Sequence, residues 1–234
     1  MKFNRTEVYK QSNLDTSLNK LIIIGAGGFG KEVLWLIRDL RQAHPDFPEP
    51  LGFADSQPST PEIQGLPVLG SDSHLLRQLD PRSTGFVIAI GSSSLRARIA
   101  QVWESAGFQA ITCIHPSVRH SEYISIGAGS VLCAGSTLTT DIHIGRHVIL
   151  NLHCTVGHDC RIEDFCTVAP GVHISGGVEI ESGCEIGTGA VLLPGISAGK
   201  NCKLGAGAVA TRSLQAGVTY AGVPARPIHK EPAA

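Results

Sequence analysis

The residues of this chain best suited to chemistry are a histidine and an aspartate side by side, His158 and Asp159. A histidine can act as a general base near neutral pH, and a neighbouring carboxylate can orient its ring or stabilise its charged form. Gly176 and Gly177 follow 18 residues later. If the fold brings these glycines against the ring, the histidine overlooks a bare backbone surface that suits a slender bound molecule. The alternative is a surface histidine without function.

A second group of candidates is the glycine-rich run at residues 25–30, which fits the pattern G-x-G-x-x-G. It follows an apolar run at residues 21–24 and precedes residues with helical spacing. In that context glycines let the backbone approach a diphosphate, and the helix N-terminus supplies N–H donors. Asp55 ends the next predicted strand, where a ribose-binding acid would lie. A tight turn without a ligand is the alternative.

The first part of the chain predicts a small α/β scaffold for these residues, because apolar runs alternate with stretches of helical spacing. Its length of about 90 residues suits one nucleotide diphosphate better than a dinucleotide. Strands are expected over residues 21–24, 50–54, 68–70 (or a turn), 86–90 and about 110–114, and helices over residues 31–42, 73–79 and 95–106, the last closed by Gly107.

The second part carries a strict six-residue repeat. An aliphatic residue or alanine recurs at every sixth position from Ile126 to Ala210, and a mostly small residue follows four positions later. A hexapeptide period predicts a parallel β-helix, in which three sides make one coil of 18 residues. His158 comes two residues after a core position, so we expect it to face outward above Gly176, with Thr140 one coil earlier.

The cysteines follow the same repeat. Cysteine in the small inward position behaves as a compact hydrophobic residue, and a spacing of six places neighbours on different sides of the coil. We therefore expect core packing rather than metal ligation, and the odd total of seven suits free thiols in a reducing compartment. The cysteines in this inward position are Cys154, Cys160, Cys166, Cys184 and Cys202.

The remaining polar candidates are less specific. We expect His120, His143, His147 and His173 at the surface or at subunit contacts, while His153 either packs at an interface or assists the site. The segment at residues 220–227 either caps the β-helix or, with Arg226 and Lys230, meets phosphates.

Composition excludes several classes of partner. The net charge of -1, without a basic block, argues against nucleic acid and anionic membranes. The chain has no run of about 18 apolar residues, so no membrane span is expected. Residues 1–18 are polar, lack the apolar core of a signal peptide and are expected to form a loose arm. A cytoplasmic protein is the expectation.

With these motifs, the chain resembles a known family. The repeat and the sequence Ala221-Gly222-Val223-Pro224-Ala225-Arg226 resemble the hexapeptide-repeat acyltransferases, and the α/β domain in front narrows the resemblance to bacterial sugar acetyltransferases of the PglD/NeuD type. The resemblance implies a left-handed β-helix, a homotrimer, and acetyl-CoA bound between subunits. It implies these parts: an N-terminal arm at 1–18, a Rossmann-like nucleotide-sugar domain at 19–112, the β-helix acetyltransferase domain at 113–217, and a cap and tail at 218–234.

The resemblance also implies roles for individual residues. His158 matches the catalytic base, and Asp159 matches the acidic residue after it, which is often glutamate. Phe29 and Thr167 depart from the family, since relatives often have histidine at the first position and some have it at the second. Matching acetyl-CoA positions are Gly176, Gly187, Thr188, Gly205, Ala206, Pro224 and Arg226, and matching nucleotide-sugar positions are Gly25, Gly27, Gly28, Phe29, Asp55, Ser56, Gly91 and Ser92.

The expected activity is acetyl transfer from acetyl-CoA to the 4-amino group of a UDP-, dTDP- or GDP-linked 4-amino-4,6-dideoxy sugar, in synthesis of glycan or lipopolysaccharide precursors. Three alternatives stay open. The first is O-acetylation of a sialic acid. The second is a zinc lyase, because His153 and His158 resemble half of a trimeric β-helix carbonic anhydrase site. The third is a nucleotide-sugar sensor or scaffold without enzymatic activity.

Overall fold

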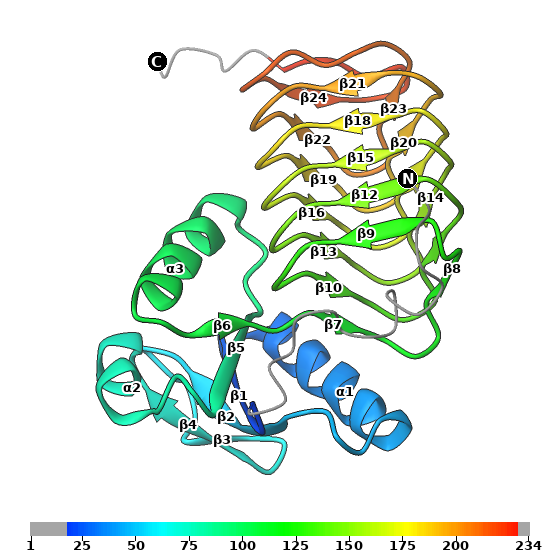
Figure 1. The fold of residues 1–234 in the computed structure, drawn as a ribbon. Coiled ribbons are helices and arrows are strands. Elements are labelled where there is room, and N and C mark those ends of the chain that lie inside the picture. Colours follow the sequence, from blue (N-terminus) through cyan, green and yellow to red (C-terminus); the bar gives the residue numbers. More distant parts are fainter. Residues whose placement is uncertain (1–17, 229–234) are drawn as a thin grey trace, which may run out of the picture.

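The computed structural model describes residues 18–228 and consists of an α/β domain beside the lower coils of a tall triangular β-helix (Figure 1). The predicted order of these two architectures is confirmed. The predicted N-terminal arm, apart from Leu18, and Lys230 lie outside the described residues. None of the helices within residues 18–228 combines the length and the apolar character needed to cross a bilayer.

The α/β domain is a six-stranded sheet in the order β3-β4-β2-β1-β5-β6, parallel except for the β3–β4 pair. Helix α1 packs on one face of the sheet, and α2 and α3 pack on the other. The elements are β1 (Lys20–Ile24), α1 (Gly28–Ala43), β2 (Glu49–Ala54), β3 (Glu62–Ile63), β4 (Leu66–Gly70), α2 (Asp72–Gln78), β5 (Thr84–Ile88), α3 (Ser93–Ser105) and β6 (Gln109–Ala110).

Most element boundaries shift by one to three residues from the sequence expectation, and the expected strand at about 110–114 is instead divided between β6 in the α/β sheet and β7 (Cys113–Ile114) in the β-helix. Helix α1 begins at Gly28 rather than residue 31, because Gly27 is its extended N-cap and its carbonyl already accepts from the Lys31 amide. The fifth strand ends at Ile88 rather than residue 90, so the residues before α3 form a loop instead. The two-residue strand β3, which pairs with β4 as a hairpin, was not predicted at all.

The β-helix consists of three parallel sheets in which most strands pair with residues 18 positions away, as Val131 pairs with Ile149. The eight-stranded sheet, called the docking face, contains β7 (Cys113–Ile114), β10 (Val131–Leu132), β13 (Ile149–Leu150), β16 (Thr167–Val168), β19 (Glu185–Ile186), β22 (Lys203–Leu204), β24 (Thr219–Ala221) and the antiparallel β25 (Arg226–Pro227). The six-stranded sheet contains β8 (Arg119–His120), β11 (Thr137–Leu138), β14 (Thr155–Val156), β17 (His173–Ile174), β20 (Val191–Leu192) and β23 (Val209–Ala210). The five-stranded sheet contains β9 (Ile124–Ile126), β12 (Ile142–Ile144), β15 (Arg161–Ile162), β18 (Glu179–Ile180) and β21 (Ser197–Ala198).

Three edges join these faces, and each is named here by its histidine. In one coil the chain passes the His147 edge (five-stranded sheet to docking face), the His153 edge (docking face to six-stranded sheet) and the His158 edge (six- to five-stranded sheet). Every sixth residue from Gly129 to Gly207 turns these edges in the left-handed conformation, with φ between 52° and 76°. Most are glycine, but His147, His153 and Asp159 hold this strained conformation too.

The inward small residues do more than fill space. The Ser130 hydroxyl donates to the Gly145 carbonyl at 2.8 Å, and the Cys160 thiol donates to the Ser175 carbonyl at 3.1 Å, in each case 15 residues further along. All seven cysteines are free and buried, and the five in the inward position belong to the core of the β-helix, as predicted. Burial raises the pKa of Cys154 to about 11, so that thiol is neutral at pH 7 and can donate.

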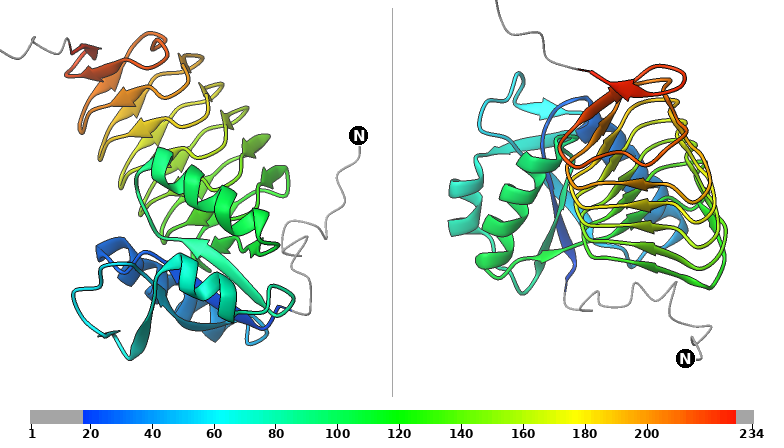
Figure 2. Two further views of the ribbon diagram at one scale, coloured as in Figure 1. Left: turned by 90° about the vertical axis from the view of Figure 1, so that its left-hand side faces the viewer. Right: turned by 90° about the horizontal axis from the view of Figure 1, so that it is seen from above.

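The outward residues of the docking face change character along the coil. Cys113, Val131 and Ile149 are buried and belong to the same apolar cluster as α1. The outward residues of the next two strands are polar, Thr167 and Glu185. Apolar outward residues therefore mark the coils that the α/β domain covers, and the view from above shows this domain on one side of the triangle (Figure 2).

Candidate active site

The His158 edge carries the predicted histidine–carboxylate pair in an open position. His158 Nδ1 lies 2.7 Å from Asp159 Oδ2, and the two side chains are 67% and 68% exposed. When the carboxylate accepts a hydrogen from Nδ1, the Nε2 atom keeps its lone pair. The pair therefore presents a basic nitrogen to solvent at the corner of the coil.

Gly176 lies directly against the His158 ring, as the 18-residue period predicts. A Cβ added at Gly176 would lie 2.6 Å from Nε2, closer than real Cβ contacts come. The Gly177 amide donates to the His158 carbonyl at 2.7 Å, which ties the two coils together at this point. Any side chain at position 176 would therefore displace the ring or occupy the space beside its basic nitrogen.

The predicted nucleotide loops meet at the carboxyl ends of three adjacent strands, β2, β1 and β5. The Gly25 amide donates to the Ala54 carbonyl at 2.9 Å, and the Ala26 amide donates to Asp55 Oδ2 at 3.1 Å. The chain leaves β1 toward β2 and later returns to β5 on its other side. Open α/β sheets bind ligands at such a topological switch point. The loops after β1, β2 and β5 are therefore expected to line the nucleotide-sugar site, and together they are called the nucleotide rim.

The rim offers one open helix N-terminus. A Cβ at Gly27, Gly28 or Gly91 would meet no atom within 4 Å, so the backbone is accessible at these positions. The N-terminus of α3 is instead closed, because Glu185 accepts hydrogen bonds from the Ser93 amide and hydroxyl at 3.2 and 3.0 Å. A diphosphate is therefore better placed at the start of α1 than at the start of α3.

Three other predicted rim residues differ in their surroundings. The Asp55 carboxylate already accepts from Ala26 and from the Gln57 amide, so it holds the loop in place. Ser56 is exposed. The Phe29 ring is partly buried against the apolar cluster under α1, and its contact with a sugar stays a prediction.

The predicted acetyl-CoA positions divide between two edges. Gly187, Thr188, Gly205 and Ala206 follow β19 and β22 on the His153 edge, where Gly187 lies against the Gly205–Ala206 backbone. Pro224 and Arg226 belong to the terminal hairpin above this edge, since the Ala221 side chain lies next to Gly205. Gly176 lies on the His158 edge instead, so the two sets border opposite edges of the six-stranded sheet.

The basic nitrogen and the nucleotide rim also lie apart within one chain. The docking face connects the His147 and His153 edges and packs against the α/β domain, so the His158 edge is the corner opposite that domain. Thr167, aligned with a histidine near the thioester in some relatives, is on the docking face and donates to the Gly91 carbonyl at 2.7 Å. It therefore contacts the rim and not the His158 edge.

The structure of one chain gives no support to the zinc lyase alternative. His153 and His158 turn different edges of the coil, and the His153 ring lies flat on Gly135, where an added Cβ would come within 2.4 Å of its Nδ1. Among residues 18–228 no three potential ligand side chains gather around one point. The two histidines of one chain cannot share an ion.

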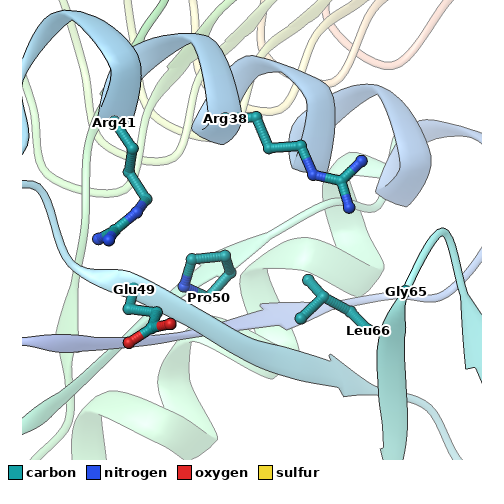
Figure 3. Close-up of a pocket in the computed structure, with 6 residues that line it drawn as sticks. All are labelled: Arg38, Arg41, Glu49, Pro50, Gly65 and Leu66. Carbon is teal, nitrogen blue, oxygen red and sulfur yellow. The ribbon is translucent and has the colours of Figure 1, made fainter.

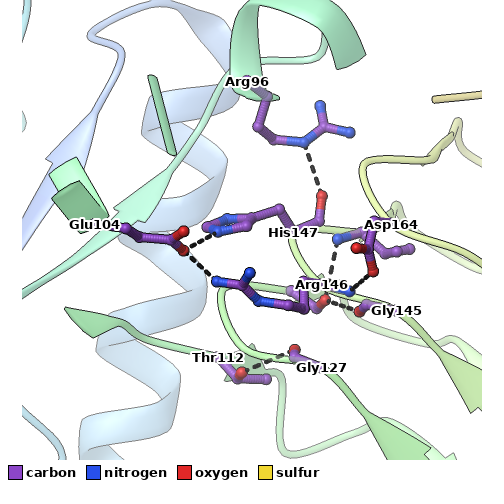
Figure 4. Close-up of polar contacts among 10 residues, drawn as sticks. Arg96, Glu104, Thr112, Gly127, Gly145, Arg146, His147 and Asp164 are labelled. Atoms are coloured by element: carbon purple, nitrogen blue, oxygen red, sulfur yellow. Dashed lines mark hydrogen bonds and ion pairs between the residues drawn. The ribbon is translucent and has the colours of Figure 1, made fainter. Parts of the chain in front are cut away.

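The expectation that His147 lies at the surface or a subunit contact was wrong. Its side chain is fully buried, stacked between Phe86 and Phe165 with ring centroids at 6.1 and 5.3 Å. Its Nε2 lies 2.9 Å from Glu104 Oε1, which Arg146 also contacts (Figure 4). Helix α3 covers this edge, and burial lowers the pKa of His147 although the bond to Glu104 opposes the shift.

Arg96 was also missed. It is buried to 1% exposure and links the loop before α3 to the β-helix through backbone carbonyls. In the sequence it is one arginine in a helix, and neither spacing nor composition distinguishes it from exposed Arg98.

A pocket of about 300 Å³ lies elsewhere on the α/β domain, between α1 and the start of β2 and β4 (Figure 3). Arg38 donates to the Gln64 carbonyl and Arg41 to the Phe47 carbonyl, both at 2.5 Å. The two guanidinium groups point in different directions (Figure 3). They hold the backbone of two loops and do not converge on one ligand.

Comparisons with known proteins match both parts of the chain, the α/β domain and the β-helix. The model of the PglD N-terminal domain matches residues 20–103, and two hexapeptide-repeat models, of bacterial transferases and of succinyl-transferase, match residues 159–194 and 177–212. GDP-perosamine N-acetyltransferase of Escherichia coli O157:H7 is 31% identical over 220 residues, which is 92% of this chain and 99% of that protein. The chain belongs to the hexapeptide-repeat sugar acetyltransferases of the PglD/NeuD type. The predicted α/β domain followed by a left-handed parallel β-helix is thereby confirmed.

Two solved structures of this family superpose along almost their whole length. One is a mutant of perosamine N-acetyltransferase from Caulobacter crescentus in complex with CoA and GDP-perosamine, with 30% identity, a TM-score of 0.84, and coverage of 90% of this chain and 97% of that chain. The other is the acetyltransferase domain of PglB from Neisseria gonorrhoeae in complex with acetyl coenzyme A, with 34% identity, a TM-score of 0.84, and coverage of 90% and 100%.

Proposed function

We propose that this acetyltransferase moves an acetyl group from acetyl-CoA to the 4-amino group of a nucleotide-linked 4-amino-4,6-dideoxy sugar. The observation that carries the proposal is the exposed His158–Asp159 pair beside Gly176, on a chain that also has an open nucleotide rim. Among UDP-, dTDP- and GDP-linked sugars, a GDP-linked one is the first candidate, because relatives that match about 90% of the chain are named for GDP-perosamine or were solved in complex with it. The proposed setting is glycan precursor synthesis in the cytoplasm, and seven free, buried thiols suit a reducing compartment.

In this proposal acetyl-CoA supplies an activated acyl group as a thioester. Asp159 orients the ring through Nδ1, and His158 Nε2 accepts the proton that the sugar amine loses when it attacks the acyl carbon. The same proton can then go to the departing thiol, so the histidine is restored. The Gly176 amide donates to no acceptor within residues 18–228 and is suited to stabilise the developing oxyanion.

We propose further that the working enzyme is a homotrimer. Within one chain the basic nitrogen lies on the edge opposite the α/β domain, and the matched acetyl-CoA positions occupy two separate edges. A neighbouring copy that places its His153 edge beside the His158 edge of the first chain brings both sets into one groove. Mass measurement of the native protein in solution tests this, and a stable, fully active monomer contradicts it.

The activity is tested by release of free CoA thiol. Purified protein receives acetyl-CoA with GDP-, UDP- or dTDP-linked 4-amino sugars, and a parallel series contains free sialic acids. Thiol release with one amino-sugar nucleotide, with a product heavier by one acetyl group, supports the proposal. Release only with sialic acid indicates O-acetylation, whereas nucleotide-sugar binding without release indicates the sensor or scaffold function.

A further inference from the structure

We infer that Arg96 is a positioning residue for the nucleotide-sugar rim, because it sets the orientation of the loop at residues 90–92. The inference rests on the proposed function, since that loop is a proposed substrate contact. Arg96 lies in the first turn of α3 and is 1% exposed. Its long side chain passes between the α/β domain and the β-helix (Figure 4).

The Arg96 guanidinium joins three segments. On the loop side, Nη1 donates to the Ile90 and Gly91 carbonyls at 2.7 and 3.1 Å. On the β-helix side, Nε donates to the His147 carbonyl at 2.8 Å, and Nη2 donates to the Phe165 and Cys166 carbonyls at 2.7 and 3.1 Å.

Thr167 reinforces this joint from the docking face. Its hydroxyl accepts from Arg96 Nη2 at 2.9 Å and donates to the Gly91 carbonyl at 2.7 Å. The Gly91 carbonyl is therefore held by two donors, one from each domain. Burial lowers the pKa of Arg96 to about 10, so the group stays charged at neutral pH, and hydrogen bonds from a charged donor are among the stronger ones.

The orientation of these carbonyls determines the orientation of the neighbouring amides. In a trans peptide the C=O and the following N–H point in opposite directions. Because the Ile90 and Gly91 carbonyls point into the joint, the Gly91 and Ser92 N–H groups point out of it. Both residues are exposed, and neither amide donates to an acceptor within residues 18–228.

These two amides form a pair of donors beside the glycine-rich loop. The Ala89 amide, just before them, donates to the Ile24 carbonyl at 2.7 Å, and Gly25 lies against the Ala89 carbonyl. A carbonyl or hydroxyl oxygen of the nucleotide can therefore accept from this pair, while the diphosphate is better placed at the start of α1. Arg96 does not touch the ligand in this arrangement; it holds the donors that do.

The experiment compares Thr167→Val, Arg96→Lys and a matched control, Thr137→Val, which changes an outward threonine on the six-stranded sheet. Calorimetry measures the affinity for GDP and, separately, for acetyl-CoA, and steady-state kinetics measure KM for each substrate and kcat. Thr167→Val should weaken GDP binding about tenfold, the size expected for one well-oriented hydrogen bond. Arg96→Lys keeps the charge but loses the planar fork and should weaken it further.

A purely structural role would lower the melting temperature and the amount of active enzyme without changing KM for the nucleotide sugar. The inference therefore predicts a raised KM for that substrate in Thr167→Val, with KM for acetyl-CoA and kcat at wild-type values, and no change in Thr137→Val. Unchanged GDP affinity in both Thr167→Val and Arg96→Lys, in a wild type that does acetylate, overturns the inference alone. A wild type that neither binds a nucleotide nor transfers acetyl overturns the proposed function first.

Discussion

Two histidine–carboxylate pairs lie on different edges of the same region of the β-helix, and burial separates them. His158 lies 2.7 Å from Asp159 with both side chains about two-thirds exposed, whereas His147 lies 2.9 Å from Glu104 and is fully buried. The first pair shares its edge with glycines of the next coil. In the second pair, the His147 ring lies between two phenylalanine rings, and Glu104 comes from α3.

The difference shows that pair geometry alone does not indicate a reactive site. An exposed histidine can exchange protons with solvent and substrate, while a buried neutral histidine contributes packing and one hydrogen bond. What separates the two is the covering domain, whose residues come from a distant part of the chain. We therefore expect substitutions at His158 to change rate and substitutions at His147 to change stability.

The largest expected effect is on catalysis at His158. Replacing it by alanine removes the proposed base, so kcat should fall about 10²- to 10⁴-fold. Because the side chain is 67% exposed, the melting temperature should change little. Steady-state kinetics and a thermal melt measure both. If His158→Ala keeps nearly full turnover with the same pH profile, the exposed pair is not the catalytic one.

The sequence alone predicts the outward position of His158 and its glycine neighbour. The six-residue period alone assigns it to an outward position above Gly176, because one coil of a parallel β-helix has a fixed length. The same period assigns His147 to the turn of an edge but says nothing of what covers that edge. Its cover depends on Glu104 and Phe86, about 40 to 60 residues earlier, and no local pattern encodes that contact.

The buried pair should show a stability effect instead. His147→Ala removes a ring packed between Phe86 and Phe165 and leaves Glu104 without that partner, so unfolding free energy should fall by about 2–4 kcal/mol. Denaturant unfolding measures the change, with kinetics on the folded fraction. A large loss of kcat at unchanged stability would mean that the buried pair takes part in the reaction.

Part of the contact between the α/β domain and the β-helix could have been predicted from the outward residues of the docking face. Cys113, Val131 and Ile149 are apolar on a side that ordinarily faces water, which marks the covered coils. Arg96 could not be predicted, because its partners are backbone carbonyls, and carbonyls leave no signal in the residue types. The split of the proposed acetyl-CoA positions between two edges could not be predicted either, because it depends on the order of the three sheets.

Gly176→Ala tests whether the exposed pair depends on its bare neighbour. The added Cβ would lie 2.6 Å from His158 Nε2, so the exposed ring must move, at little cost to stability. A displacement of this size in a catalytic group should lower kcat about 10- to 100-fold. KM for acetyl-CoA and the melting temperature serve as controls. Wild-type kcat in this variant would show that the ring position above Gly176 is not the productive one.

The two pairs should also differ in their response to acid. Burial lowers the pKa of His147 below its ordinary value of 6.5, so the unfolded chain takes up a proton more readily than the folded one. Stability from this residue is thus present at neutral pH and lost as the pH falls below about 6.5. The hydrogen bonds from His147 and Arg146 lower the pKa of Glu104 despite its desolvation, and that contribution is lost only at lower pH.

Thermal melts between about pH 7 and pH 5 measure this loss, with His147→Asn as the comparison, because asparagine tolerates the left-handed backbone and does not titrate. The variant should lose less stability on acidification than the wild type. An equal loss in both would assign the acid sensitivity to other groups.

The smallest expected effect concerns Cys160, which lies behind the His158 edge. Its thiol donates to the Ser175 carbonyl at 3.1 Å, and the hydroxyl of Ser130 makes the equivalent bond to Gly145 at 2.8 Å. Serine at position 160 should therefore keep the bond and leave kcat unchanged, whereas Cys160→Ala leaves the carbonyl unpaired and should lose about 1 kcal/mol. Denaturant unfolding of both variants measures the difference. If Cys160→Ser is the less stable of the two, the thiol acts by its apolar volume alone, and the repeat needs a small hydrophobic residue rather than a donor behind its exposed histidine.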